Sequence, residues 1–260
     1  MSFPSGRRVS SARPSSVSLS STRSPTTAAT RPEISQEGRN KTMPGISLQK
    51  GQGISLTKEA PAVSKFYIAL GWLEEAGVDP DVSAFLCKTD AGGNPMLYPN
   101  TAGQVQSEVD YGNLVFFNNT RSADQAVIHV YGDNRTGKNA ADRAGTPAAE
   151  DDEAISVDLS KLDGNIDEIS FVVTIDGAKS KGQTFRNVRN SFIRICENDG
   201  FGTEVARYKL DESFSPFTAV QFGSLIKEGS GWRFEAVGQG YGASNNVVDF
   251  EAVVGQYLTA

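Results

Sequence analysis

Oxygen-bearing side chains are concentrated between residues 132 and 153. The segment opens with Gly-Asp-Asn-Arg-Thr-Gly at 132–137 and ends with Asp151, Asp152 and Glu153. Carboxylates that converge repel one another unless a positive charge lies between them. Calcium takes six to eight oxygen ligands and needs neither nitrogen nor sulfur. These residue types therefore indicate a site for a hard divalent cation. A solvated acidic surface, neutralised locally by Arg135, Lys138 and Arg143, is the alternative.

Further donors lie elsewhere in the chain. Asp79 and Asp81 flank Pro80, and residues two apart face the same side of an extended backbone. Asp110 lies before an apolar run that ends in Asn118-Asn119, a pair that we interpret as a turn. Strand ends cluster at the two poles of a β-sandwich, so distant loops can share one ion there.

Short apolar runs separated by Gly, Asn, Asp and Pro follow one another from Gly45 onward. This pattern is typical of an all-β sandwich or barrel. The predicted strands are 63–70, 82–87, 114–117, 126–131, 154–159, 168–175, 191–196, 204–210, 219–226 and 232–238. We expect helix only near 182–189 and at 211–213. No boundary interrupts these runs, so residues 46–260 are predicted to form one domain.

The charge of the chain is unevenly distributed. Residues 1–45 carry seven basic and two acidic groups, a balance of +5, so the remainder carries −11 of the total −6. The Ser-, Arg- and Pro-rich tail 1–45 lacks large apolar groups and is predicted to be disordered, with a transit peptide as an alternative. A domain of charge −11 is a poor partner for nucleic acid. No apolar run reaches the 18 residues of a membrane helix, and we expect a cytoplasmic protein.

Other reactive side chains have structural interpretations. Cys87 and Cys196 lie in apolar strand-like runs and are expected to be reduced thiols, although a disulfide between them stays open. His129, the single histidine, is expected to be a structural residue beside the acidic loop. The glycine-rich segment 238–242 lacks the Lys-Ser/Thr of a phosphate loop and is interpreted as a turn or strand end. The aromatic residues of the strands are expected to lie in the core.

Many of these motifs together resemble the TerD family of tellurium-resistance and stress proteins. The motifs, in order, are Ile-Ser-Leu-Thr-Lys-Glu-Ala-Pro at 54–61, Leu-Gly-Trp at 70–72, Asp-Val-Ser-Ala-Phe-Leu at 81–86, Val-Phe-Phe-Asn-Asn at 115–119, Gly-Asp-Asn-Arg-Thr-Gly at 132–137, Asp-Asp-Glu at 151–153, Phe-Val-Val-Thr-Ile at 171–175, Ser-Phe-Ile-Arg at 191–194 and Ala-Val-Gly-Gln-Gly-Tyr at 236–241. The resemblance extends over almost the whole predicted domain.

The resemblance implies a β-sandwich of two mostly antiparallel sheets that binds calcium through acidic loops. It assigns ligand roles to Asp79, Asp81, Asp133, Asn134, Asp151, Asp152 and Glu153. It also implies a non-enzymatic role in tellurite resistance, general stress or phage defence. The expected partners are other stress proteins, with a membrane-associated complex among the options.

The chain departs from the family pattern in several places. Residues 138–150 replace a shorter Gly-Asp-rich link, so Asp142 and Glu150 leave the ligand list and we expect one ion instead of two. Asp176 stands where the family has a histidine, and the basic tail is foreign to the family. Two other functions stay open. One is an assembly role in which the tail docks a partner, and the other is a metal-dependent phosphoester hydrolase.

Overall fold

A computed structural model of the chain describes residues 45–74, 77–98, 112–131, 147–210, 212–243 and 245–258. The predictions for the tail, apart from Gly45, and those for Asp110, Asp133 and Asn134 lie outside these ranges.

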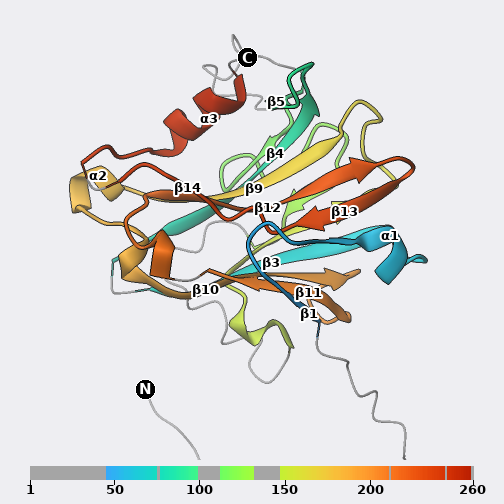
Figure 1. The fold of residues 1–260 in the computed structure, drawn as a ribbon, viewed down its shortest axis with the longest axis horizontal. Helices are drawn as coiled ribbons and strands as arrows, with labels where there is room; N and C mark the ends of the chain where they lie inside the picture. The colour runs from blue at the N-terminus through green and yellow to red at the C-terminus, as the bar shows by residue number, and fades with distance from the viewer. Residues whose placement is uncertain are drawn as a thin grey trace, which may run out of the picture. The chain divides into compact units, whose positions relative to one another are not determined.

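The described residues form two β-sheets, as predicted (Figure 1). The six-stranded sheet has the order β1 (Ile46–Leu48), β11 (Glu204–Lys209), β10 (Val188–Glu197), β3 (Lys65–Glu74), β8 (Glu153–Asp158) and β7 (Val127–His129). The eight-stranded sheet has the order β2 (Gly53–Ser55), β13 (Gly231–Glu235), β12 (Ala219–Glu228), β9 (Glu168–Ile175), β4 (Pro80–Thr89) and β5 (Pro95–Leu97), with β14 (Gln239–Tyr241) on β12 and β6 (Leu114–Val115) on β4.

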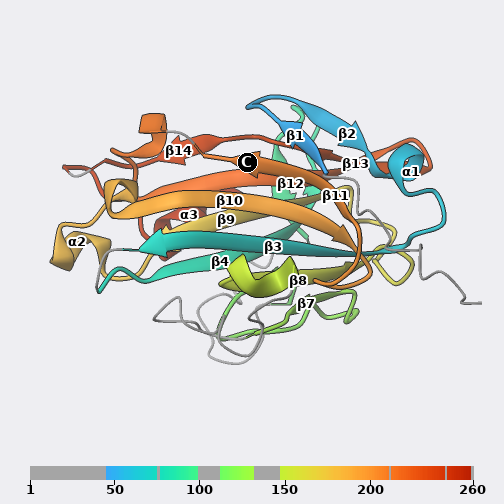
Figure 2. The same cartoon turned by 90° about the horizontal axis from the view of Figure 1, so that it is seen from below.

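The two sheets pack face to face. The long strands β3 and β4, one from each sheet, lie along nearly the same axis and run in opposite directions (Figure 2), as in aligned sandwiches. Of the described strand pairs only β1–β11 is parallel. The prediction of a mostly antiparallel β-sandwich is confirmed.

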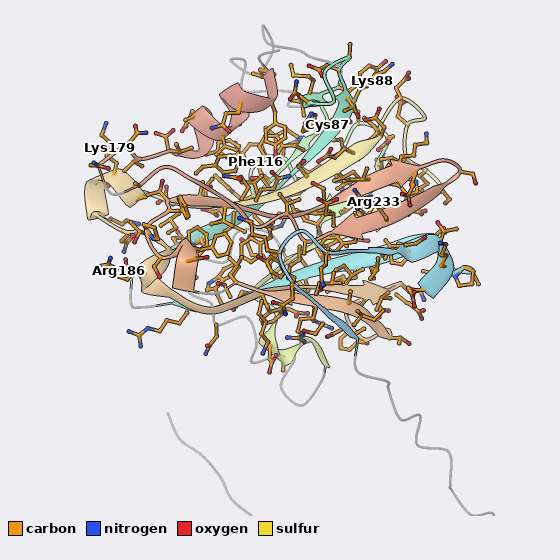
Figure 3. The ribbon with its side chains drawn as sticks, viewed as in Figure 1. Cys87, Lys88, Phe116, Lys179, Arg186 and Arg233 are labelled. Atoms are coloured by element: carbon orange, nitrogen blue, oxygen red, sulfur yellow. The ribbon has the colours of Figure 1, made fainter. Side chains whose placement is uncertain are left out.

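Alternation along each strand divides the apolar residues between the faces of the sheets. In β10, Ile193 and Ile195 belong to the main core between the sheets, whereas Cys196 lies in a small cluster on the opposite face. In β4, Leu86 belongs to the main core, while Cys87 packs in a second cluster under α3 (Phe250–Leu258). Figure 3 shows Cys87 on the side of the sheet that α3 covers. Both cysteines are buried free thiols, so the disulfide alternative is wrong.

The helical predictions are partly wrong. Near 182–189 and 211–213 the structure has only the short 3₁₀ helices η3 (Phe185–Asn187) and η4 (Glu212–Phe214). Within the described part of the chain, the one longer helix is α3, where we predicted none. Its Val-Val pair and Gly255 disfavour helix locally. Packing overrides this preference, because Val253, Val254 and Tyr257 are buried against the outer face of the eight-stranded sheet.

The remaining short elements are α1 (Leu56–Glu59), α2 (Ala178–Lys181) and η2 (Pro147–Glu150). The sequence patterns also missed β1, β2 and β5, each three residues long. Segment 238–242, which we interpreted as a turn or strand end, contains the separate short strand β14, which pairs with β12. The stretch 116–119 closes a turn through two backbone hydrogen bonds between Phe116 and Asn119, as expected. Within the described ranges, no helix is long and apolar enough to cross a bilayer.

Candidate metal centre

The predicted acidic triad lies where the chain enters β8, and its first member is bound by an arginine. Arg194 Nε donates to Asp151 Oδ1 over 2.7 Å, and Arg194 Nη2 donates to Asp151 Oδ2 over 2.5 Å. Both side chains are almost completely buried. Burial by itself lowers the pKa of Arg194, but the Asp151 carboxylate outweighs that effect and raises it. Asp151 is therefore held by a permanent positive charge on the outer face of the six-stranded sheet.

The second member, Asp152, is tied to the neighbouring strand β3. Its Oδ2 accepts a hydrogen bond from the backbone N–H of Trp72 over 2.8 Å, and the side chain is buried. The backbone N–H of Asp152 donates to Leu70 O over 2.8 Å. These two bonds fix the carboxylate beside the Leu-Gly-Trp motif.

The third member, Glu153, points between the sheets, because Ile155 and Val157 on the same face of β8 belong to the main core. Its Oε2 accepts a hydrogen bond from the backbone N–H of Val82 over 2.6 Å. His129 Nε2 lies 3.7 Å from the same oxygen, which places the single histidine beside the acidic group. Glu153 thus connects the start of β8 with the start of β4.

The contact with Val82 brings the Asp79–Asp81 pair to the same end of the sandwich. Asp79 and Asp81 are both half-buried. The backbone carbonyl of Asp79 accepts from the N–H of Asp176 over 2.8 Å, so the aspartate that replaces the family's histidine adjoins the pair. Asp81 also lines a hollow of about 580 Å³ on the α3 side of the eight-stranded sheet, together with Asp249 and Glu251.

The described donors do not form a complete metal site by themselves. Across the described ranges, no three His, Cys, Asp or Glu side chains converge closely enough to hold an ion. The ligand roles of all seven residues stay predictions. The chemistry of two of them fits a hard cation: Asp152 is 4% exposed and Glu153 0% exposed, and each carboxylate is oriented by a backbone N–H. A buried carboxylate is stabilised by a positive charge beside it.

Comparison with known proteins places the chain in a family. The sequence model of the TerD domain family matches residues 44–244 of this chain. The chain belongs to the TerD family. A tellurium resistance protein TerD of an Alcaligenes species is 38% identical over 200 residues, which cover 75% of this chain and 91% of that protein. General stress protein 16U of Bacillus subtilis is 36% identical over 215 residues, with coverages of 81% and 99%. TerD proteins are thus associated with tellurium resistance and stress response.

Among solved structures, the crystal structure of SAV2460, a protein of unknown function, matches with a TM-score of 0.52. It is 23% identical and covers 75% of this chain and 97% of its own. This similarity supports the TerD fold alone.

Within this TerD domain the structure adds residues that the sequence patterns did not single out. Arg194 appeared only as the last residue of the motif at 191–194, and its role as the partner of Asp151 was missed. The available signal was an arginine inside the apolar run Phe-Ile-Arg-Ile-Cys, since a buried cation needs an anionic partner. Glu150 is exposed and pairs with Arg207 over 3.4 Å.

Proposed function

We propose that this TerD domain is a non-enzymatic calcium-binding module that acts through partner proteins in the response to tellurite or general stress. The observation that supports calcium most strongly is the hydrogen bond from Val82 N–H to Glu153 Oε2. It joins two acidic segments that are far apart in the sequence at one end of the sandwich. The family supports the physiological setting, since its relatives are named for tellurium resistance and stress.

The geometry suggests different roles for the three residues of the triad. Asp151 gives both oxygens to Arg194 and so acts as an anchor that fixes the entry into β8. Asp152 and Glu153 are each oriented by a backbone N–H and are the proposed ligands of the triad, together with Asp79, Asp81, Asp133 and Asn134. Calcium would neutralise the carboxylates at this end of the domain and so stabilise it.

The test is thermal unfolding of the full chain. A chelator first removes bound cations, and the protein is then titrated with calcium. Binding to the folded form stabilises it by RT ln(1 + [L]/Kd), about 2.7 kcal/mol at a hundredfold excess over Kd. The melting temperature should rise with calcium, and Asp152→Asn or Glu153→Gln should remove the rise. Asp163→Asn is the matched control, because Asp163 is exposed and accepts from the N–H of Asn165 in a separate turn. An unchanged melting temperature at millimolar calcium would refute the proposal.

Asp151→Asn separates anchor from ligand. We expect this variant to be less stable without calcium, yet to keep a calcium-dependent rise of its melting temperature. A different result would assign Asp151 to the ion instead: the Asp151→Asn variant has normal stability without calcium, but calcium no longer raises its melting temperature.

A further inference from the structure

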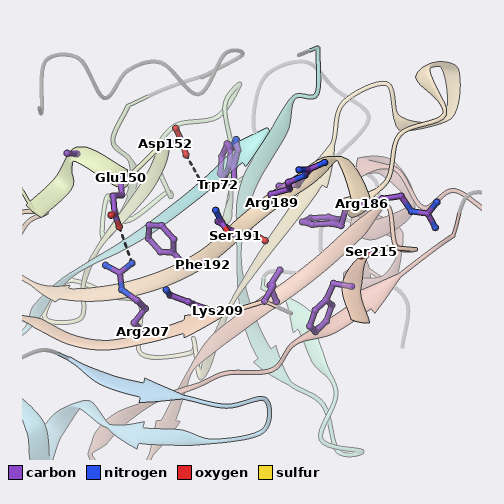
Figure 4. A pocket seen from close by; sticks show the side chains of 16 residues that line it. Trp72, Glu150, Asp152, Arg186, Arg189, Ser191, Phe192, Arg207, Lys209 and Ser215 are labelled. Carbon is purple, nitrogen blue, oxygen red and sulfur yellow. Dashed lines mark hydrogen bonds and ion pairs between the residues drawn. The ribbon is translucent and has the colours of Figure 1, made fainter. Parts of the chain in front are cut away.

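A second cavity, separate from the predicted calcium ligands except for Asp152, lies over β3, β10 and β11. Its volume is about 1230 Å³. Figure 4 shows Ser191 at its centre, with Trp72 and Arg189 above it and Arg207 and Lys209 below it. A volume of this size accommodates a small organic molecule.

The lining of this cavity is positive although the domain is acidic. Four basic residues line it: Arg186, Arg189, Arg207 and Lys209. The acidic residues of the lining are Glu150 and Asp152. A concave positive patch on a domain of charge −11 focuses the local potential and attracts anions.

The basic residues have different tasks. Arg207 is held by Glu204, over 2.8 Å, and by Glu150, over 3.4 Å, and its guanidinium lies over the ring of Phe192 at 4.3 Å. Arg207 therefore has a structural role in the wall of the cavity. Arg186 and Lys209 are exposed, and within the described ranges neither makes an ion pair with an acidic side chain. Figure 4 shows these two cations on opposite sides of Ser191, so they attract an anion toward the cavity without meeting at one point.

The backbone around the cavity is irregular. The register between β10 and β3 shifts between Arg189 and Phe192, so Asn190 and Ser191 together oppose Trp72. Asn190 has a positive φ of 52°, which is uncommon for a residue other than glycine. Bulges and strained residues of this kind re-aim side chains and are enriched at binding sites.

One buried donor lines the cavity without a hydrogen bond of its own. Trp72 is 5% exposed, and its indole Nε1 has no hydrogen-bond partner among the described residues. A buried N–H without an acceptor costs free energy, which an acceptor on a ligand would recover. The apolar part of the lining comes from Phe185, Phe192, Phe214, Val188 and Leu210.

We propose that this cavity binds a small organic phosphate, with the phosphoryl group attracted by the basic lining and held by the donors around Ser191, and the organic part against the phenylalanines. Guanidinium and ammonium groups are the usual phosphate ligands in proteins. The proposal goes beyond the proposed function and does not depend on calcium.

Tryptophan fluorescence of the full chain tests the site. The chain has two tryptophans, so Trp232→Phe leaves Trp72 as the only reporter. This background is titrated separately with adenosine 5′-monophosphate, adenosine and inorganic phosphate. The nucleotide should change the Trp72 emission with saturation, and more tightly than phosphate or adenosine. Its affinity should fall as ionic strength rises.

The deciding comparison pairs two double variants of equal charge. Arg186→Ala with Lys209→Ala should weaken nucleotide binding at least about tenfold, since two of the cations that make the lining positive are lost. Lys58→Ala with Lys179→Ala removes two cations that do not line this cavity and should leave binding unchanged. Circular dichroism checks that both fold.

Three results would overturn the proposal: no saturable change at millimolar nucleotide, equal losses in both double variants, or phosphate alone binding as tightly as the nucleotide. The last result would leave the apolar wall without a role in binding.

Discussion

Arg194 donates to both carboxylate oxygens of Asp151 across the outer face of the six-stranded sheet, 43 positions away in the chain. The pair is almost completely buried. It fixes the segment from which Asp152 and Glu153 project, so the anchor and the candidate ligands are consecutive residues with opposite tasks.

Removing one partner of this pair should be costly. Asp151→Asn or Arg194→Met leaves one buried polar group without its partner, and we expect a loss of about 3–5 kcal/mol in the free energy of unfolding. The double variant should lose less than the sum of the two, because neither charge is then left alone. Urea unfolding of the two single variants and the double variant measures this coupling, and strictly additive losses would show that the pair contributes no coupling energy.

Gly71 in the Leu-Gly-Trp motif is required by close packing. A Cβ at this position would lie 2.1 Å from Glu150 O and 2.4 Å from Phe192 Cζ. Gly71→Ala should therefore reduce the free energy of unfolding by about 3 kcal/mol. Gly255→Ala in α3 is the control: a Cβ there meets nothing within 4 Å, and alanine should be neutral or stabilise by up to about 1 kcal/mol. Chemical denaturation compares them, and similar effects of the two changes would contradict the packing argument.

The reactivity of the two thiols shows which outer face of the sandwich becomes accessible, because Cys87 and Cys196 lie in separate clusters. Burial raises the pKa of Cys87 well above its ordinary range and the pKa of Cys196 to about 12. Neither should react with a thiol reagent in the native protein at neutral pH.

Truncation under α3 should expose Cys87 alone. The ring of Tyr257 stacks on Phe85 at 4.2 Å, in the same cluster as Cys87. Tyr257→Ala should cost about 3–5 kcal/mol and make Cys87 reactive, while Cys196, in a separate cluster, stays protected. Mass spectrometry after labelling identifies the modified residue. Tyr257→Leu, which keeps most of the volume, should preserve protection, and equal reactivity of both thiols in Tyr257→Ala would indicate global unfolding.

Acid should weaken one surface turn in a predictable way. The Ser160 hydroxyl donates to Asp158 Oδ1 over 2.6 Å, and this bond, with Lys161 nearby, lowers the pKa of Asp158 in the folded protein. The resulting stabilisation is complete above the unfolded value of about 3.9 and is lost as pH falls through the lower folded value.

Ser160→Ala tests this linkage. It should lower the free energy of unfolding by about 0.5 kcal/mol at neutral pH, and the difference from the parent protein should shrink in acid. Ser180→Ala is the control, because the Ser180 hydroxyl donates to the neutral carbonyl of Gly177. Urea unfolding at several pH values gives both curves, and a pH-independent effect of Ser160→Ala would rule out the Asp158 contribution.

Local pattern was sufficient for the long strands and for the donor types. Strand β9 has the predicted bounds, Glu168–Ile175, because an apolar run is closed by aspartates at 167 and 176. The concentration of carboxylates around Asp151–Glu153 and at Asp79 and Asp81 was likewise visible as chemistry before any fold was considered.

Long-range packing decided the remaining features. Period-two alternation would place Asp151 and Glu153, two positions apart, on the same side of a strand. Instead Glu153 meets Val82, 71 positions away, and Asp151 meets Arg194 on the outer face, because β8 begins only at Glu153. Periodicity also does not show that Phe250–Leu258 is helical, since its valines and glycine favour no helix until the outer face of the eight-stranded sheet buries them. A sequence pattern reports each residue's own preference, whereas contacts between distant residues depend on the register and stacking of whole sheets.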